Sequence, residues 1–175
     1  MLQAVFNIAC MMKKVLFTSS ILLLALINLV KAQTTRVAGY AGIVHPIVAF
    51  DSNGSHFNFK NSYTVGMPLG INLWKGDKVG FSLEMVPFIR AEAGNSKMNN
   101  LLIHPGILVA LGKGYTFVGR AAFETSGRYG LTPVLNKVII RNKASNVFVA
   151  LPFPMRFGNN VPSSYGVAFQ FGVGF

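Results

Sequence analysis

The sequence predicts an all-β protein folded as an eight-stranded antiparallel up-and-down barrel. Three observations predict this fold. Apolar side chains recur at every second position in eight successive segments, short connections rich in Gly, Asn, Asp and Ser separate those segments, and the number of segments is even. An even number of strands joined by hairpins brings the last strand back beside the first, so the sheet can close.

Six of the eight segments alternate clearly between two unlike faces. They are residues 63–73, 79–89, 101–111, 115–123, 147–157 and 165–175. In the second of them, for example, the apolar Phe81 and Leu83 stand on either side of Ser82. Residues 36–50 and 128–141 alternate less regularly, and we expect them to be the first and sixth strands.

The connections fall into two groups. The turns "WKGDK", "GKGY" and "RNKAS" alternate along the chain with "DSNGSHF", "EAGNSKMNN", "ETSGR" and "GNNVPSS". Consecutive hairpins place the two groups at opposite ends of a barrel. If the first strand starts in the periplasm, the first group lies on that side and the second faces the cell exterior.

The composition of the two faces predicts which one points outward. One face carries large apolar side chains in strand after strand, whereas the other is rich in glycine and small residues. Glycine weakens a strand and usually marks a close approach, as in a narrow lumen filled by a few large side chains. Tilted strands of about 9–11 residues suit a bilayer, where only a closed barrel satisfies every backbone group. We therefore expect a transmembrane barrel with its apolar face toward lipid.

Proline departs from this pattern, because it cannot donate a hydrogen bond to a sheet. Seven prolines fall inside the expected strands: Pro46, Pro68, Pro87, Pro105, Pro133, Pro152 and Pro154. They could form a belt of loosened pairing or bulges toward the outer rim. Alternatively, the strands end at these points.

The N-terminal segment has the pattern of a signal peptide. Lys13 and Lys14 precede an apolar run, residues 15–30, and Ala32 provides the small side chain that signal peptidase requires. This run is short for a membrane span, although an uncleaved anchor is the alternative. We expect a cleaved signal peptide over residues 1–32, translated from Met1 or from Met12.

Residues 33–175 are then a single barrel domain without cysteine, because Cys10 is the chain's only one. A disulfide framework and a thiolate metal site are thereby excluded from this domain. The formal charge of the whole chain is +11, but basic residues are spread singly and aromatic residues are not interleaved with them. That distribution argues against nucleic-acid binding.

Together these features resemble the small outer-membrane β-barrels of Gram-negative bacteria, in particular OmpA/OmpX-like barrels and PorT-like outer-membrane proteins. The resemblance rests on the signal peptide, the eight strands and the terminal "YGVAFQFGVGF". It implies location in the outer membrane, contact with outer-membrane lipid and lipopolysaccharide, and recognition of the last strand by the barrel-assembly machinery. The residues implied in that recognition are Tyr165, Val167, Phe169, Phe171, Val173 and Phe175.

Strand parity points a set of charged residues into the lumen: Glu84, Arg90, Arg120, Glu124 and Arg156. Glu84 falls at a height similar to that of Arg120, and Glu124 at a height similar to that of Arg156. Charges in a confined lumen must pair, because an isolated buried ion is too costly. Eight strands leave room only for side chains, which favours an electrostatic plug; a gated narrow pore is the alternative.

The sequence holds no pattern that favours a metal, a cofactor or catalysis. His45, His56 and His104 share no metal-ligand spacing, and acidic partners are few. No local His-x-Ser arrangement is present, and Thr125 and Ser126 follow Glu124 without a nearby histidine. We expect neither a metal nor a cofactor.

These features lead to three hypotheses about function. The first is an integral outer-membrane barrel without catalysis, in a structural, docking or narrow-channel role. The second is a soluble periplasmic barrel that carries an apolar ligand as lipocalins do, and the third is a lipid-modifying barrel enzyme. The oligomeric state stays open.

Two further sets of residues lie near strand ends. The aromatic residues there either form interfacial girdles or pack at the barrel ends: Tyr63, Trp74, Tyr115, Tyr165 and Phe175. Four cations near the outer rim either meet lipopolysaccharide phosphates or are simply solvated: Lys60, Arg90, Lys97 and Arg128.

Overall fold

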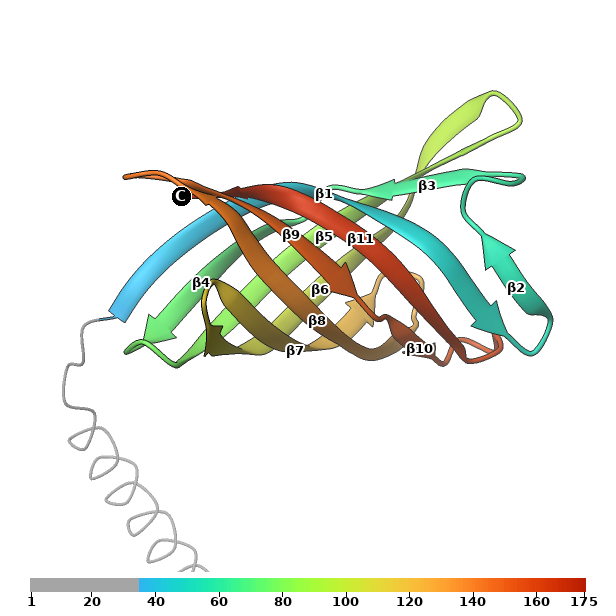
Figure 1. Cartoon of the computed structure of the whole chain (residues 1–175). Coiled ribbons are helices and arrows are strands. Elements are labelled where there is room, and N and C mark those ends of the chain that lie inside the picture. The colour runs from blue at the N-terminus through green and yellow to red at the C-terminus, as the bar shows by residue number, and fades with distance from the viewer. Residues whose placement is uncertain (1–34) are drawn as a thin grey trace, which may run out of the picture. The chain divides into compact units, whose positions relative to one another are not determined.

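The computed structural model describes residues 35–175, which form one antiparallel β-sheet (Figure 1). The predicted signal peptide lies outside these residues. The strands are β1 (Thr35–Asp51), β2 (Gly54–Phe57), β3 (Tyr63–Gly66), β4 (Leu69–Lys75), β5 (Val79–Glu92), β6 (Asn95–Gly112), β7 (Tyr115–Glu124), β8 (Tyr129–Arg141), β9 (Asn146–Pro152), β10 (Met155–Phe157) and β11 (Ser164–Gly174). No helix within residues 35–175 is long and apolar enough to cross a membrane.

The sheet closes on itself, because β11 pairs antiparallel with β1 from Phe50↔Tyr165 to Tyr40↔Gly174. β3 and β4 follow one another along the same neighbours and make one strand of the ring, and β9 and β10 make another. β2 pairs only with the end of β1 and extends it beyond the ring. The described residues therefore confirm the predicted eight-stranded antiparallel up-and-down barrel.

Two of the expected connections form strands instead of loops. The β5–β6 pairing continues as far as Glu92↔Asn95, around a two-residue turn in which Ala93 and Gly94 both have positive φ. This hairpin extends past the ring in Figure 1. The segment after Asp51 likewise pairs back as β2. Polar side chains suggested loops here, but an exposed two-stranded ribbon tolerates polar residues on both faces.

Backbone irregularities explain why the first and sixth strands alternate weakly in sequence. The register shifts between Pro46 and Val48 in β1, and between Val138 and Ile140 in β8. An extra residue at a bulge reverses the faces of all residues after it. Ile139 and Ile140 are consequently both exposed, although strict alternation places them on opposite faces.

Three of the seven prolines fit one of the two interpretations. Pro68 lies between β3 and β4, and Pro154 lies between β9 and β10, so these two ring strands are interrupted at proline. Pro46 adjoins the bulge in β1. The remaining four stay within strands and keep sheet neighbours: Pro87, Pro105, Pro133 and Pro152.

Large apolar side chains cover the outside of the barrel, as on Phe81, Ile107 and Leu151. The inside holds two small apolar clusters. One contains Val44, Val86, Leu102, Ala122 and Ala168, and the other contains Trp74, Leu108, Val118, Val134 and Ala150. Trp74 is thus buried in the lumen and takes no part in an outer aromatic girdle.

Between the two clusters the lumen is polar. On β6, His104 lies between Leu102 of one cluster and Leu108 of the other. On β7, Arg120 separates Val118 from Ala122 in the same way. The polar layer therefore crosses the middle of the barrel interior.

Inward-facing glycines make room for the large residues of this layer. A Cβ atom added to Gly106 would lie 2.6 Å from Arg120 Cγ and 2.7 Å from the backbone oxygen of Gly119. Gly119 itself, on the neighbouring strand, would meet nothing closer than Phe117 at 3.8 Å.

We expect Gly106→Ala to lower the free energy of unfolding by about 1–3 kcal/mol, because the added methyl group forces apart well-packed backbone. Gly119→Ala is the matched control, and we expect it to leave stability unchanged or raise it by up to about 1 kcal/mol. Denaturant unfolding in detergent, followed by Trp74 fluorescence, measures both. Equal stabilities of the two variants would contradict this account of the lumen.

Candidate functional site

One hydrogen-bonded network fills the middle of the lumen. We call it the lumen network, and its members are Tyr40, Ser82, Glu84, His104, Arg120, Glu124, Thr132, Arg156 and Gln170. They come from β1, β5, β6, β7, β8, β10 and β11. Seven of the eight ring strands are therefore joined to one another through side chains as well as through the sheet.

Glu84 lies at the centre of the lumen network, with only 3% of its surface exposed. Its carboxylate accepts a hydrogen bond from the Tyr40 hydroxyl (2.9 Å) and lies 3.1 Å from His104 Nδ1. Arg120 Nη1 forms a salt bridge to it at 3.5 Å, while Arg120 Nη2 donates to the Tyr40 hydroxyl at 2.9 Å. Glu84 and Arg120, which the sequence placed at similar heights, are thus brought together.

Arg156 and Glu124 form the second ion pair of the network. Arg156 Nε donates to Glu124 Oε1 at 2.6 Å, and Arg156 Nη1 donates to Thr132 Oγ1 at 3.0 Å. The same nitrogen also donates to the backbone oxygens of Leu131 and Met155. β10 begins directly after the interruption of the ring strand at Pro154, and this interruption positions Arg156 to reach inward.

His104 connects the two ion pairs. With Nδ1–H donating to Glu84, Nε2 is left to accept from the Thr132 hydroxyl at 3.1 Å, and Arg156 Nη2 lies 3.4 Å from the same nitrogen. Since arginine is only a donor, a neutral imidazole with Nε2 as the acceptor satisfies all three contacts. Two carboxylates and two guanidinium groups then balance one another inside the barrel.

Arg90 lies apart from the other residues predicted for the lumen. Its Nη2 contacts Glu92 Oε2 at 3.1 Å, and both side chains are substantially exposed. The pair lies on the part of the β5–β6 hairpin that pairs beyond the bulge at Phe88/Ile89. Arg90 still pairs with Thr64 of the ring strand β3, so it lies at the rim of the ring, where its ion pair with Glu92 leaves it outside the lumen network.

Sequence reasoning considered only charged residues and so missed five network members: Tyr40, Ser82, His104, Thr132 and Gln170. Tyr40 and Thr132 lie on β1 and β8, two strands with bulges, where the alternation was weakest. His104 was considered only as a metal ligand or a hydrolase residue, although it has the same parity on β6 as Glu84 has on β5, and the two are direct cross-strand neighbours. Among residues 35–175, no group of three His, Cys, Asp or Glu side chains is arranged to hold a metal ion.

The order Glu84, His104, Thr132 matches the acid, imidazole and hydroxyl order of a hydrolase triad. The surroundings differ from those of a working nucleophile. Thr132 is 2% exposed, and its hydroxyl accepts from Arg156 as well as facing His104. None of the three residues lines the lumen cavity described next. The arrangement therefore satisfies buried charges and presents no hydroxyl to a substrate.

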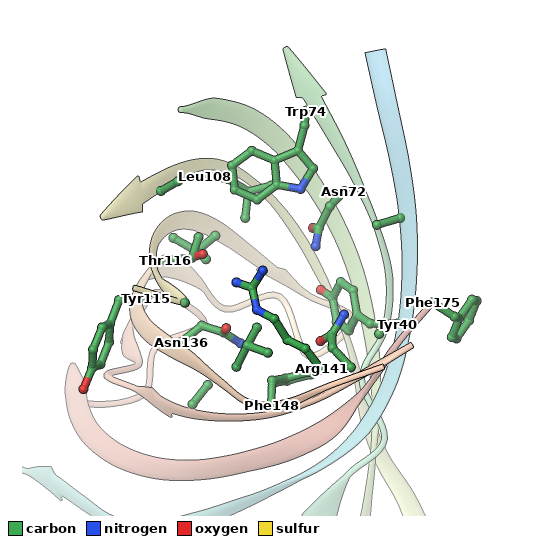
Figure 2. A pocket seen from close by; sticks show the side chains of 18 of the residues that line it. Tyr40, Asn72, Trp74, Leu108, Tyr115, Thr116, Asn136, Arg141, Phe148 and Phe175 are labelled. Carbon is green, nitrogen blue, oxygen red and sulfur yellow. The ribbon is translucent and has the colours of Figure 1, made fainter. Parts of the chain in front are cut away.

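A cavity of about 620 Å³ occupies the lumen on one side of the network (Figure 2). It lies at the end of the barrel that carries the turns β4–β5, β6–β7 and β8–β9, which we call the short-turn end. Tyr40, Arg120 and Gln170 of the lumen network line it, together with Trp74 and Phe148. The lumen is thus closed in the middle and open at this end.

The four cations expected at the outer rim differ in their surroundings. Arg128 Nη2 donates to the backbone oxygens of Arg156 (3.2 Å) and Pro162 (3.0 Å) and to Ser164 Oγ (3.1 Å), so it holds the β10–β11 connection. Arg90 is paired with Glu92. Lys60 and Lys97 are exposed.

The residues implied in assembly lie on β11, the strand that closes the ring against β1. Within this set, Tyr165, Phe169, Phe171, Val173 and Phe175 are exposed on the outer surface. Beyond the end of β11, Phe175 still exchanges backbone hydrogen bonds with Gly39 of β1, at 2.8 and 2.9 Å. The apolar stripe of β11 is therefore continuous with the outer surface of the barrel.

Comparisons with known proteins yield one structural likeness. No protein-family model matches the chain, and no curated protein matches it. A solved structure described as "De novo design of transmembrane beta-barrels" is similar over 79% of this chain and 93% of its own, with 9% sequence identity and a TM-score of 0.44. The barrel assignment rests on the strand pairing of this chain itself.

We expect Glu84→Gln to lower the free energy of unfolding by about 3 kcal/mol or more, because it leaves the Arg120 guanidinium buried without its counter-charge. Glu92→Gln removes the same charge from the exposed pair with Arg90, and we expect a change of no more than about 0.5 kcal/mol. Denaturant titration of both variants in the same detergent provides the measurement. A Glu84 variant as stable as the Glu92 variant would show that the lumen network does not hold the barrel together.

Proposed function

We propose that this protein is an integral barrel of the outer membrane, related in type to OmpA/OmpX-like and PorT-like proteins, with a non-catalytic structural or docking role. The observation that carries the proposal is the outward direction of the large apolar side chains on every strand of the ring. Examples from three strands are Phe81, Ile107 and Leu135.

Such a surface is unfavourable in water. On a soluble monomer the largest apolar patch usually covers only about 300–600 Å². In this barrel the exposed apolar side chains instead surround the whole ring, since they lie on β1, β4, β5, β6, β7, β8, β9 and β11. In a bilayer the same side chains meet acyl chains, and closure of the ring satisfies the backbone groups that lipid cannot. The distribution of side chains thus supports membrane insertion.

The two ends of the barrel carry different connections, and we propose an orientation in the membrane from that difference. The resemblance to Gram-negative barrels suggests that the short-turn end faces the periplasm and the longer hairpins face the exterior. Lys60 and Lys97, exposed at the longer-hairpin end, are then the cations available to lipopolysaccharide phosphates. The apolar stripe of β11 is the segment we propose for recognition by the barrel-assembly machinery.

The alternative of a lipocalin-like carrier requires an apolar interior and a polar exterior. The side chains of this barrel have the opposite distribution, with buried ion pairs inside and apolar residues outside. The alternative of a lipid-modifying enzyme requires an accessible nucleophile, and the hydroxyl of the triad-like arrangement is sealed. These observations favour the non-catalytic membrane barrel.

We expect Ile107→Lys to reduce the amount of folded protein in the outer-membrane fraction, because a cation on the lipid-facing middle of a strand costs about 2–4 kcal/mol. Met98→Lys, on the exposed hairpin part of the same strand β6, is the matched control, since Met98 is 61% exposed and Ile107 is 59% exposed. Fractionation and the mobility of unboiled samples on gels report insertion and folding. A soluble barrel would tolerate or benefit from both substitutions, which would overturn the proposal.

The lumen network favours a plugged barrel over the alternative role of a narrow channel. We expect the purified barrel to give no resolved conductance steps in planar bilayers, because two ion pairs and their partners block the middle of the lumen. The same preparation must show the folded mobility on gels. Reproducible conductance steps from folded protein would replace the plug with the narrow-channel role.

A further inference from the structure

We propose that the cavity at the short-turn end of the lumen binds a small organic anion, with Arg141 holding the anionic group and Trp74 and Phe148 contacting the apolar body. This inference concerns the lumen alone and goes beyond the proposed membrane role. It depends on the charge, the volume and the lining of the cavity.

The charge at the mouth of the cavity is strongly positive. Four cations, Arg36, Lys113, Arg141 and Lys143, line it against one acidic side chain, that of Asp77. None of the four forms a salt bridge within residues 35–175. The ion pairs at the floor balance one another, so nothing behind the mouth offsets its charge. A concave site lined by one sign of charge concentrates counter-ions, here anions.

Arg141 is the cation best placed to bind such an anion. Figure 2 shows its guanidinium group among the side chains that line the cavity, and Nη2 lies beside the β6–β7 turn, 3.6 Å from where a Cβ atom of Gly114 would stand. Arginine offers a planar set of donors that matches a carboxylate, and such charge-assisted hydrogen bonds are the stronger ones in proteins. Arg36, by contrast, lies over the Trp74 ring at 5.6 Å.

The walls of the cavity suit a partly apolar body. Trp74, Leu108, Val118 and Phe148 line it beneath the cations. Its volume of about 620 Å³ falls within the range of about 300–1,000 Å³ typical of small-molecule sites. An inorganic ion would leave most of this space and the aromatic rings unused.

Two buried polar atoms at the cavity lack partners. Asn72 Oδ1 and Arg120 Nε are inaccessible and have no hydrogen-bond partner within the described residues, and both residues line the cavity. Buried polar groups are normally paired with protein, water or ligand. Asn72 and Arg120 therefore give this wall of the cavity polar character, although these two atoms themselves are closed to an occupant. The cations at the mouth and the apolar walls together fit an aromatic or short-chain carboxylate.

The test uses the nitrogen-15-labelled full barrel, refolded in a zwitterionic detergent and titrated with 4-hydroxybenzoate. Trp74 is the only tryptophan of the chain, so its indole N–H signal is unique and reports directly from the cavity wall. We expect a saturable shift of this signal. The neutral 4-hydroxybenzamide, which keeps the ring and the hydroxyl, should bind at least about tenfold more weakly.

Arg141→Gln should weaken binding of 4-hydroxybenzoate by about tenfold or more. Lys97→Gln makes the same change in charge on the exposed β5–β6 hairpin and should bind like the wild type. Unboiled gel mobility confirms that both variants fold, and the comparison of the two probes needs only the wild-type chain. Absence of a saturable shift, or equal affinity for the neutral and anionic probes, would overturn the proposal and leave a water-filled cavity.

Discussion

The salt bridge between Glu84 and Arg120 inside an eight-stranded ring is the interaction on which the rest of the interior depends. A ring of this size has room for side chains but no water-filled channel, so each charge in its middle must find a partner there. Tyr40, His104 and Gln170 complete the surroundings of the carboxylate. The ring strand formed by β3 and β4 contributes no member to the network. It contributes Gly70 instead, where a Cβ atom would collide with the Tyr40 ring.

The distribution of apolar and polar side chains in this barrel is the opposite of that in a water-soluble domain. In water, burial of apolar side chains drives folding and polar groups remain outside. Here most of the large apolar side chains face outward, so they are not buried by folding of the chain itself. The interior contains only two small apolar clusters. Backbone pairing around the closed ring and the charge pairs across it must therefore hold the structure together. Such a design is favourable only where lipid covers the outside.

Much of the fold could be predicted from the sequence, because period-two alternation is strong wherever a strand is regular. Six strands followed from it, and so did the inward direction of Glu84 and Arg120. Bulges at Pro46/Val48 and Val138/Ile140 hid the pattern in β1 and β8, and with it the roles of Tyr40 and Thr132. Parity also placed Arg90 with the lumen charges, but Arg90 lies at the rim, beside Thr64 of β3, and pairs with Glu92 of its own strand. Alternation predicts the face on which a side chain lies, but not the partner that it finds there.

The lumen network also limits what motions the barrel can use. Its members come from seven ring strands, and His104 links the two ion pairs, so displacing one side chain would leave a charge on another strand without its partner. Opening a continuous path through the middle therefore requires several contacts to break together. The β9–β10 interruption is the place with the least backbone pairing near the network, since Arg156 is held there by β10 of only three residues. Any rearrangement of the lumen should begin there, while the cavity at the short-turn end remains accessible without it.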